Sequence, residues 1–368
     1  MAIGEQIMDL TTLTLMTLVA GYGDPAPGDP TVEGPSNVVV TGNYPNYAER
    51  AVLLYTNASR VDPAAHEQAY NQGGCSFDDF KPEEKTAKRP LYWSQPLAEA
   101  ARYHSQDMQE NNYFEHETMD GRKVVMQAGD RVALWYGTSY VGENIAYGYA
   151  DAWDVQMRGW MCSSGHRSNI MVSSYTELGT GVFATHYTQD FGSEEVDTEM
   201  SIPMGIHDPQ NAQSGDFATF YGDYLNPNLG QQGATLDDGP SEYIVVLNGI
   251  PYEMDLLWGS AGSGVYSASI ELSQDRDCHE YFFQATDSNG ESRFPEDGSY
   301  LVGACDLVET PDMWIDFQSP ISGRDDLSPS ELAESITFIG CSSTSSSRSP
   351  FWVLGLMALM TLRRERQV

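Results

Sequence analysis

Basic residues are scarce in this chain of 368 residues: 19 Lys and Arg stand against 53 Asp and Glu, which gives a formal net charge of −34. We therefore expect no nucleic-acid partner, because a phosphate backbone is bound by concentrated Lys and Arg side chains. The shortage is greatest in residues 205–340, where three basic residues and no Lys stand against 24 acidic residues. Such a surface needs counterions, which fits a saline extracellular setting.

Cysteine is also scarce, with five residues in the whole chain. This number excludes a small scaffold built from many disulfides and is typical of a secreted protein with one or two of them. Cys278 and Cys305 flank a hairpin-like stretch and are expected to pair, which would stabilise the fold by roughly 3 to 4 kcal/mol on the chain-entropy estimate. Cys75 and Cys162 are expected to form a second bond, which leaves Cys341 alone.

The chain has little in the way of long apolar runs. Near the N-terminus a short run at 13–20 precedes a segment rich in Pro, Gly and Asp, which is the outline of a secretory signal peptide. The basic residues that normally open such a signal are missing from residues 1–12. We interpret 1–23 as a signal-like segment and 24–45 as a linker.

A second apolar run, Phe351–Leu362, lies between a Ser/Thr-rich segment and an arginine cluster. Its length falls short of the ~20 residues that span a bilayer. The order of Cys341, short hydrophobic stretch and arginines resembles the MYXO-CTERM type of bacterial sorting tail. That resemblance implies that the tail 341–368 is processed, that Cys341 is the processed or lipidated residue, and that the protein is held at the membrane or cell surface. The alternative is a short membrane-inserted helix with an unrelated cysteine.

Hydrophobic periodicity divides the rest of the chain in two. One helical pattern starts at Tyr47 and a second covers 95–112, whereas a strand pattern covers 178–183. This alternation predicts an α/β layered domain over 46–204. Over 205–340, short β-prone runs separated by Gly, Asp, Asn and Pro turns predict an all-β, Ig-like sandwich.

Several segments between residues 95 and 192 match one family in order and spacing. They are Leu97–Met108, Tyr113–His116, Gly142–Tyr149, Trp160–Met161, Gly165–Met171 and Glu177–Gly181. Together they resemble the CAP superfamily (cysteine-rich secretory proteins, antigen 5, pathogenesis-related 1) in its bacterial SCP-like form. The resemblance covers about residues 47–192. It implies an α-β-α sandwich, an extracellular location, and a cleft lined by two His and two acidic residues.

Carried onto this sequence, the resemblance assigns His116, Glu143 and His166 to three of the four cleft positions. The fourth departs from the pattern, because Ser163 stands where other members place a Glu. Two imidazoles and one carboxylate have the chemistry to bind Zn²⁺ with an open coordination position, or to place a general base beside a water. No His-Glu-x-x-His helix is present, so the spacing by itself does not identify a metal site.

Competing interpretations of single residues stay open. His104 lies on the apolar stripe of its helix, and we expect a hydrogen-bonded core histidine there. Glu143 has the alternative role of binding loop backbone. Ser163 lies three residues before His166, but a Ser-His pair without a third orienting group rarely aligns for catalysis. Cys162 is also near His166, although a disulfide is the expected state of a cysteine in an exported protein.

The sequence thus supports two functions from different classes. The first is an exported, cell-surface binding protein whose CAP cleft holds a lipid, a glycan or a divalent cation, with Zn²⁺ or Ca²⁺ as the candidate ions. The second is a secreted, metal-dependent hydrolase of peptidase type, with Zn²⁺ on His116 and His166 and with Glu143 as the general base.

Overall fold

The computed structural model describes residues 32–33, 39–40, 45–120, 123–138, 141–194, 200–231, 233–296 and 298–305. The expected signal segment, the sorting tail and Cys341 lie outside these residues. Within the expected linker, two short strands pair antiparallel, namely β1 (Val32–Glu33) and β2 (Val39–Val40).

Residues 45–194 form an α/β sandwich around a four-stranded sheet with strand order β3-β7-β8-β6. Its strands are β3 (Tyr92–Trp93), β6 (Gly142–Tyr147), β7 (Glu177–Phe183) and β8 (His186–Gly192). Strand β3 runs parallel to β7, and the other pairs are antiparallel. A separate two-stranded sheet consists of β4 (Thr118–Asp120) and β5 (Lys123–Met126). Because β6 is an edge strand, one side of its backbone is open to neighbouring loops.

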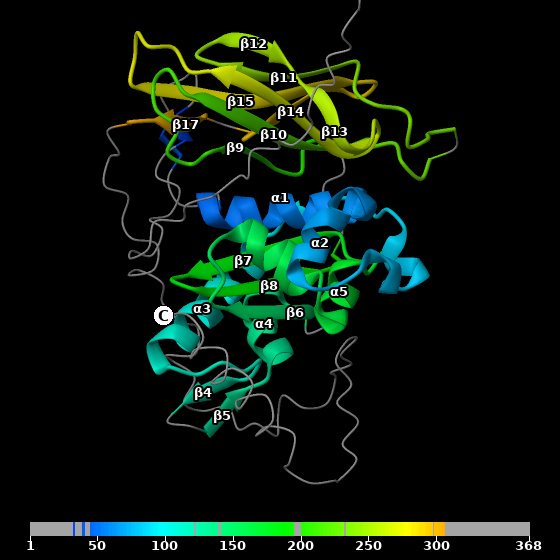
Figure 1. The fold of residues 1–368 in the computed structure, drawn as a ribbon, viewed down its shortest axis with the longest axis vertical. Coiled ribbons are helices and arrows are strands. Elements are labelled where there is room, and N and C mark those ends of the chain that lie inside the picture. The colour runs from blue at the N-terminus through cyan, green and yellow to red at the C-terminus, as the bar shows by residue number, and fades with distance from the viewer. Residues whose placement is uncertain are drawn as a thin grey trace, which may run out of the picture.

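Helices cover both faces of this sheet (Figure 1). They are α1 (Tyr47–Val61), α2 (Glu67–Gly73), α3 (Gln95–Asn111), α4 (Ala128–Tyr136), a π-helical segment (Asp154–Trp160) and α5 (Ser164–Ile170). Helix α3 lies close against β7, where a Cβ atom on Gly179 would come within 2.1 Å of the α3 backbone. Thr180, on the opposite face, donates to the Glu49 carbonyl of α1 (3.1 Å). The predicted α-β-α sandwich is therefore present.

Helix α1 begins at Tyr47, as its sequence predicts, and a capping box precedes it. The Asn46 side chain accepts from the Glu49 N–H (2.9 Å), and the Glu49 carboxylate accepts from the Asn46 N–H (3.1 Å). The same carboxylate pairs with both Nε and Nη2 of Arg102 on α3, at 2.7 and 2.6 Å. Every residue of α1 except Ala48 is buried. Both its apolar and its polar faces are therefore covered.

The C-terminal region, residues 200–305, contains two further antiparallel sheets. One has the order β13-β14-β10-β9, and the other has the order β12-β11-β15-β16 with β17 also paired to β15. The strands are β9 (Gly205–Asp208), β10 (Phe217–Leu225), β11 (Glu242–Leu247), β12 (Ile250–Glu253), β13 (Asp255–Ser260), β14 (Ser263–Glu271), β15 (Cys278–Asp287), β16 (Gly290–Phe294) and β17 (Tyr300–Gly303). The sheets face each other, since the Phe220 and Tyr281 rings meet at 4.9 Å. An all-β region is thus confirmed.

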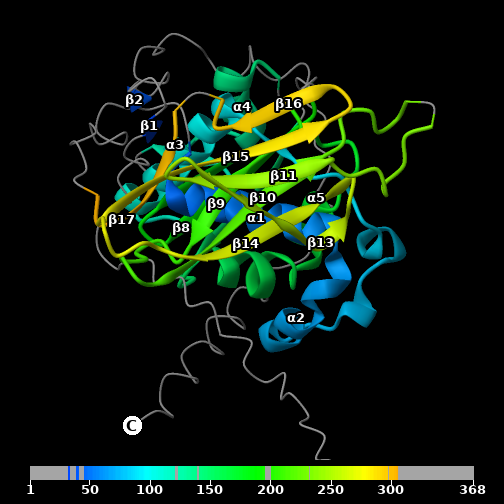
Figure 2. The same ribbon diagram turned by 90° about the horizontal axis from the view of Figure 1, so that it is seen from above.

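Helix α1 lies between the α/β sandwich and the C-terminal sheets (Figures 1 and 2). Buried apolar residues of both regions belong to one continuous core. Polar side chains of α1 are buried because they have partners across this boundary. Three such contacts are Tyr47 with Asp208 (3.3 Å), the Arg50 guanidinium with the Tyr300 ring (4.0 Å to its centroid), and Asn57 with Asp223. The C-terminal sheets therefore complete the burial of a helix that belongs to the N-terminal sandwich.

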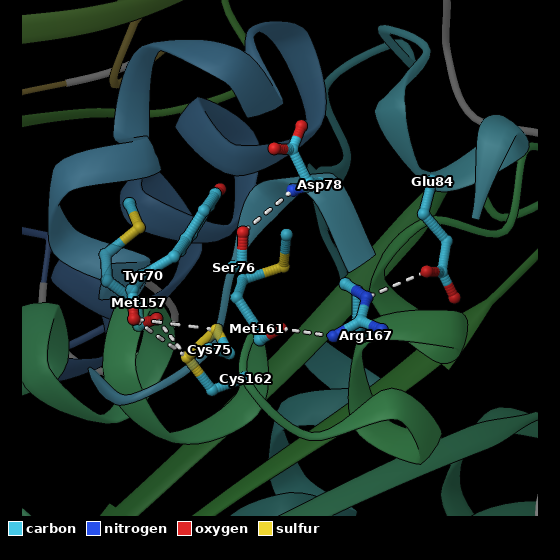
Figure 3. The surroundings of a disulfide bond; sticks show 9 residues. All are labelled: Tyr70, Cys75, Ser76, Asp78, Glu84, Met157, Met161, Cys162 and Arg167. Atoms are coloured by element: carbon cyan, nitrogen blue, oxygen red, sulfur yellow. Dashed lines mark hydrogen bonds and ion pairs between the residues drawn. A yellow bond between two sulfur atoms is a disulfide. The ribbon is translucent and has the colours of Figure 1, made fainter. Parts of the chain in front are cut away.

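Both predicted disulfides are present. Cys75 is bonded to Cys162 with a Cα–Cα distance of 5.3 Å, and Cys278 is bonded to Cys305 with one of 4.6 Å. The first bond joins the loop after α2 to the end of the π-helical segment, next to the Tyr70 carbonyl (Figure 3).

Replacing both Cys75 and Cys162 with Ala should lower the free energy of unfolding by about 4–5 kcal/mol on the chain-entropy estimate, because the unfolded chain loses a long covalent loop. The two cysteines are 87 residues apart, against 27 for Cys278 and Cys305. Urea unfolding should therefore show a larger loss of unfolding free energy when Cys75 and Cys162 are replaced than when Cys278 and Cys305 are replaced. Equal stability of the first variant and the wild type would contradict this.

Candidate functional site

The candidate site is centred on Glu143, a buried carboxylate on the edge strand β6. In the β6–β8 ladder Glu143 lies opposite Asp190, which is also buried. Burial and the negative charge of Glu143 raise the pKa of Asp190 well above its usual range. Asp190 is therefore the neutral member of this carboxyl pair, and Glu143 carries the charge.

His116 lies over Glu143 and supplies the first contact that the sequence predicted. Its Nδ1 is 2.8 Å from Glu143 Oε1, although 27 residues separate the two in the chain. Burial opposes a charge on this ring, but the hydrogen bond and charge of Glu143 outweigh burial and raise the pKa of His116. The His116 side chain is 43% exposed, so a ligand can reach it.

Arg131, on α4, makes the second contact to Glu143. Its Nη2 donates to Glu143 Oε2, and its Nη1 donates to the His116 carbonyl (2.9 Å) and to Thr118 Oγ1 (3.1 Å). The guanidinium is completely buried. Although burial alone would raise the pKa of Glu143, the charge of Arg131 and the neighbouring histidines hold it well below its usual range.

His104 is the buried core histidine that its helical position predicts. Its Nε2 is 3.0 Å from the Glu115 carbonyl and 4.0 Å from Glu143 Oε1. Burial, reinforced by the charge of Arg131, lowers the pKa of His104 to about 3. His104 therefore stays neutral and holds the loop that carries His116.

His166 lies on α5, and two asparagine side chains connect α5 to β6 by hydrogen bonds to backbone carbonyls. Asn144 donates to the His166 carbonyl (3.2 Å), and Asn169 donates to the Glu143 carbonyl (3.1 Å). Burial and the nearby charge of His116 lower the pKa of His166 to about 4. Ser163 precedes the first residue of α5, and no hydrogen bond among the described residues joins Ser163 to His166.

The two candidate ligand histidines should titrate far apart. In a two-dimensional NMR titration, we expect the His116 ring to lose its proton above pH 6.5 and the His166 ring to stay neutral down to about pH 4. Replacing His116 with Gln removes the neighbouring charge, so the pKa of His166 should rise. Equal pKa values for the two rings would contradict the electrostatic description of this site.

Glu143 contacts Nδ1 of His116, so Nε2 is the ring nitrogen that a metal ion on His116 and His166 would use. No group of three or more His, Cys, Asp or Glu side chains in the described part of the chain is arranged to hold a metal ion. Both Glu143 oxygens have partners already, and one of these is the Arg131 guanidinium. A second cation on the same carboxylate would meet a full positive charge.

Two members of the cluster, Arg131 and Asp190, were not predicted from the sequence. Neither lies in a motif that marks it, since Arg131 is an interior residue of α4 and Asp190 joins Glu143 only through strand register. A separate cavity of about 640 Å³ lies in the C-terminal region. It is lined mainly by polar residues, including Asn226, Asp238 and Asp287, and by none of the predicted site residues.

The α/β sandwich and the cluster of His116, Glu143 and Arg131 belong to one segment of the chain, and this segment matches a known family. Residues 44–192 match the Cysteine-rich secretory protein family, CAP. This segment of the chain is a CAP domain, as its motifs predicted.

Two curated relatives and two solved structures are similar to this segment. The chain is 44% identical over 102 residues to the uncharacterized membrane protein YlbC and 35% identical over 113 residues to the uncharacterized protein YkwD, both of Bacillus subtilis. These matches cover 27% and 29% of this chain and 28% and 41% of the relatives.

An extracellular protein containing a SCP domain from Bacillus anthracis is 38% identical, with a TM-score of 0.26, over 29% of this chain and 35% of that one. A cysteine-rich secretory protein from Staphylococcus aureus is 20% identical, with a TM-score of 0.24, over 43% and 42%. Among the described residues, no helix has the length and apolar character needed to cross a bilayer.

Proposed function

We propose that this chain is an exported protein whose CAP domain binds an extracellular lipid, glycan or divalent cation at the cluster of His116, Glu143 and His166. Two disulfides support an oxidising location, because such bonds persist outside the cytosol. The Bacillus anthracis protein of similar sequence is described as extracellular, which agrees with this location.

The observation that carries the binding role is the state of Glu143. A general base needs a free oxygen and a pKa near the working pH. Here both oxygens are engaged, and Arg131 holds the pKa of Glu143 low. The carboxylate is suited to orienting His116 through Nδ1, so that Nε2 can form a hydrogen bond with a ligand.

The hydrolase remains the second candidate function, and one observation favours it. Two nearby histidines with pKa values moved in opposite directions offer one proton donor and one proton acceptor. A hydrolase of this kind would use His116 and His166 directly, without Glu143 as base.

Replacing His116 with Ala tests the binding role. Phosphatidylglycerol vesicles, an oligosaccharide array, and Zn²⁺ or Ca²⁺ serve as probes of the three ligand classes. We expect one class to bind the wild type and to bind the variant at least tenfold more weakly. Glu110→Ala, an exposed change on α3, is the control and should bind normally. Turnover of a peptide or ester by the wild type, lost in the variant, would instead favour the hydrolase.

Two finer assignments belong to this proposal. The facing antiparallel sheets of residues 200–305 support an Ig-like sandwich. The MYXO-CTERM-like tail supports surface attachment at Cys341, and intact-mass spectrometry of surface-extracted protein tests it. A mature C-terminus near Cys341 with added lipid mass is expected, and a terminus at Val368 would refute processing.

A further inference from the structure

Two large aromatic side chains are exposed close to the histidine–glutamate cluster. Phe114 is 45% exposed and Tyr147 is 60% exposed. They are the only strongly exposed large hydrophobic residues in the described part of 45–194. A folded protein rarely leaves such side chains together in water without a use for them.

These two rings form one surface with His186, which we call the aromatic face. The Tyr147 and His186 rings are paired across the β6–β8 ladder, with centroids 4.7 Å apart. The Phe114 ring lies 6.3 Å from Tyr147 and 6.5 Å from His186. His186 is only 6% exposed, yet its Nδ1 has no hydrogen-bond partner among the described residues. A buried polar atom of this kind costs free energy until a water or a ligand group satisfies it.

The aromatic face and Glu143 lie along the same strand, β6. Glu143 and Tyr147 are four residues apart on β6, so both side chains lie on one face of the sheet, roughly 13 Å apart. Phe114 and His116 lie two residues apart in the loop after α3. This loop therefore meets the strand twice, at His116 over Glu143 and at Phe114 beside Tyr147.

The composition of this surface distinguishes among the three ligand classes. A lipid chain needs aliphatic walls, but the large exposed aliphatic residues of the described chain all lie within 236–257, in the C-terminal region. A divalent cation is held best by several carboxylate or histidine ligands, and no group of three such side chains occurs among the described residues. Flat rings with polar edges next to a hydrogen-bond donor suit a sugar, which has one apolar face and a rim of hydroxyls.

We propose that the CAP domain binds a glycan. One sugar ring stacks on Tyr147 and Phe114, and hydroxyl groups of the next sugar unit form hydrogen bonds with His116. This inference rests on the proposed binding function and names its ligand class. His186 Nδ1 lies where it can be satisfied by a hydroxyl group of the bound sugar or by a water that the sugar orders.

The test is an array of neutral and N-acetylated oligosaccharides, probed with the wild-type chain and three variants. Tyr147→Ala removes the ring, and we expect glycan binding to weaken at least tenfold. Tyr147→Phe keeps the ring without the hydroxyl group and should retain most of the binding. Phe217→Ala removes an aromatic that is 63% exposed on β10, away from the site, and should bind like the wild type. Circular dichroism verifies that each variant is folded.

Absence of glycan binding by the wild type, or binding that Tyr147→Ala leaves unchanged, would overturn the glycan inference. Parallel measurements with phosphatidylglycerol vesicles and Zn²⁺ separate this failure from that of the proposed function. Binding of either probe that depends on His116 would leave the proposed function standing with another ligand class. Failure of all three probes would remove both.

Discussion

A fragment that ends at residue 194 and so lacks the C-terminal sheets should lose more than about 5 kcal/mol of folding free energy, which is the whole margin of a typical domain. Helix α1 is buried on the side facing the four-stranded sheet of the CAP domain and on the side facing β9, β10 and β14. Removing those strands exposes apolar residues of α1 and leaves Arg50 and Asn57 without the partners they have now.

Thermal unfolding followed by circular dichroism checks this expectation. The fragment should melt without a cooperative transition or aggregate, whereas the full chain should melt cooperatively. A matched point variant is Asn57→Leu, which leaves the buried Asp223 carboxyl and the Leu91 backbone without their amide partner and should cost at least about 1–3 kcal/mol. A fragment that melts like the full chain would mean that the CAP domain is independent of the C-terminal sheets.

Replacing Arg131 with Met should destabilise the protein by about 3–5 kcal/mol at neutral pH, because it leaves the buried Glu143 charge without its guanidinium. Arg131 holds the pKa of Glu143 below its usual range in the folded state. The stability that this pair contributes is therefore present above the unfolded pKa of the carboxyl group and is lost as the pH falls through the folded value. The difference between variant and wild type should narrow in acid.

Urea unfolding at pH 7 and at pH 4 measures both effects. Arg158→Met is the matched control, because Arg158 pairs with Asp154 at a partly exposed position, 33% and 25% exposed. Such surface pairs contribute about 0–1 kcal/mol, so this change should be small at both pH values. A loss for Arg131→Met no larger than that for Arg158→Met would show that the buried pair is not what stabilises the site.

The sequence predicted the start of α1 at Tyr47 and the extent of α3, over 95–112, from hydrophobic periodicity. In the structure Asn46 and Glu49 form a capping box before α1, and Asn112 ends α3 in the left-handed conformation, with φ of 53°. The burial of α1 on every side was not predicted. Glu49 and Arg50 suggest a solvated face, and only their distant partners, Arg102 and Tyr300, explain why they are buried.

The sequence also predicted only part of the candidate site. His116 and Glu143 lie in recognisable motifs, and the structure brings them into contact. Arg131 could not be identified, because an isolated arginine in an amphipathic helix is usually solvated. Its contact with Glu143 places a resident positive charge beside two histidines and a carboxylate, a donor set suited to Zn²⁺.

The central claim is that His116 and the aromatic face beside it bind a glycan. A crystal structure of the full chain, grown with Zn²⁺ and soaked with an oligosaccharide that the array identifies, tests it most directly. We expect electron density for a sugar ring over Tyr147 and for a neighbouring sugar unit within hydrogen-bonding distance of His116, with Arg131 still on Glu143. A Zn²⁺ ion bridging His116 and His166, with no sugar over Tyr147, would contradict the glycan claim.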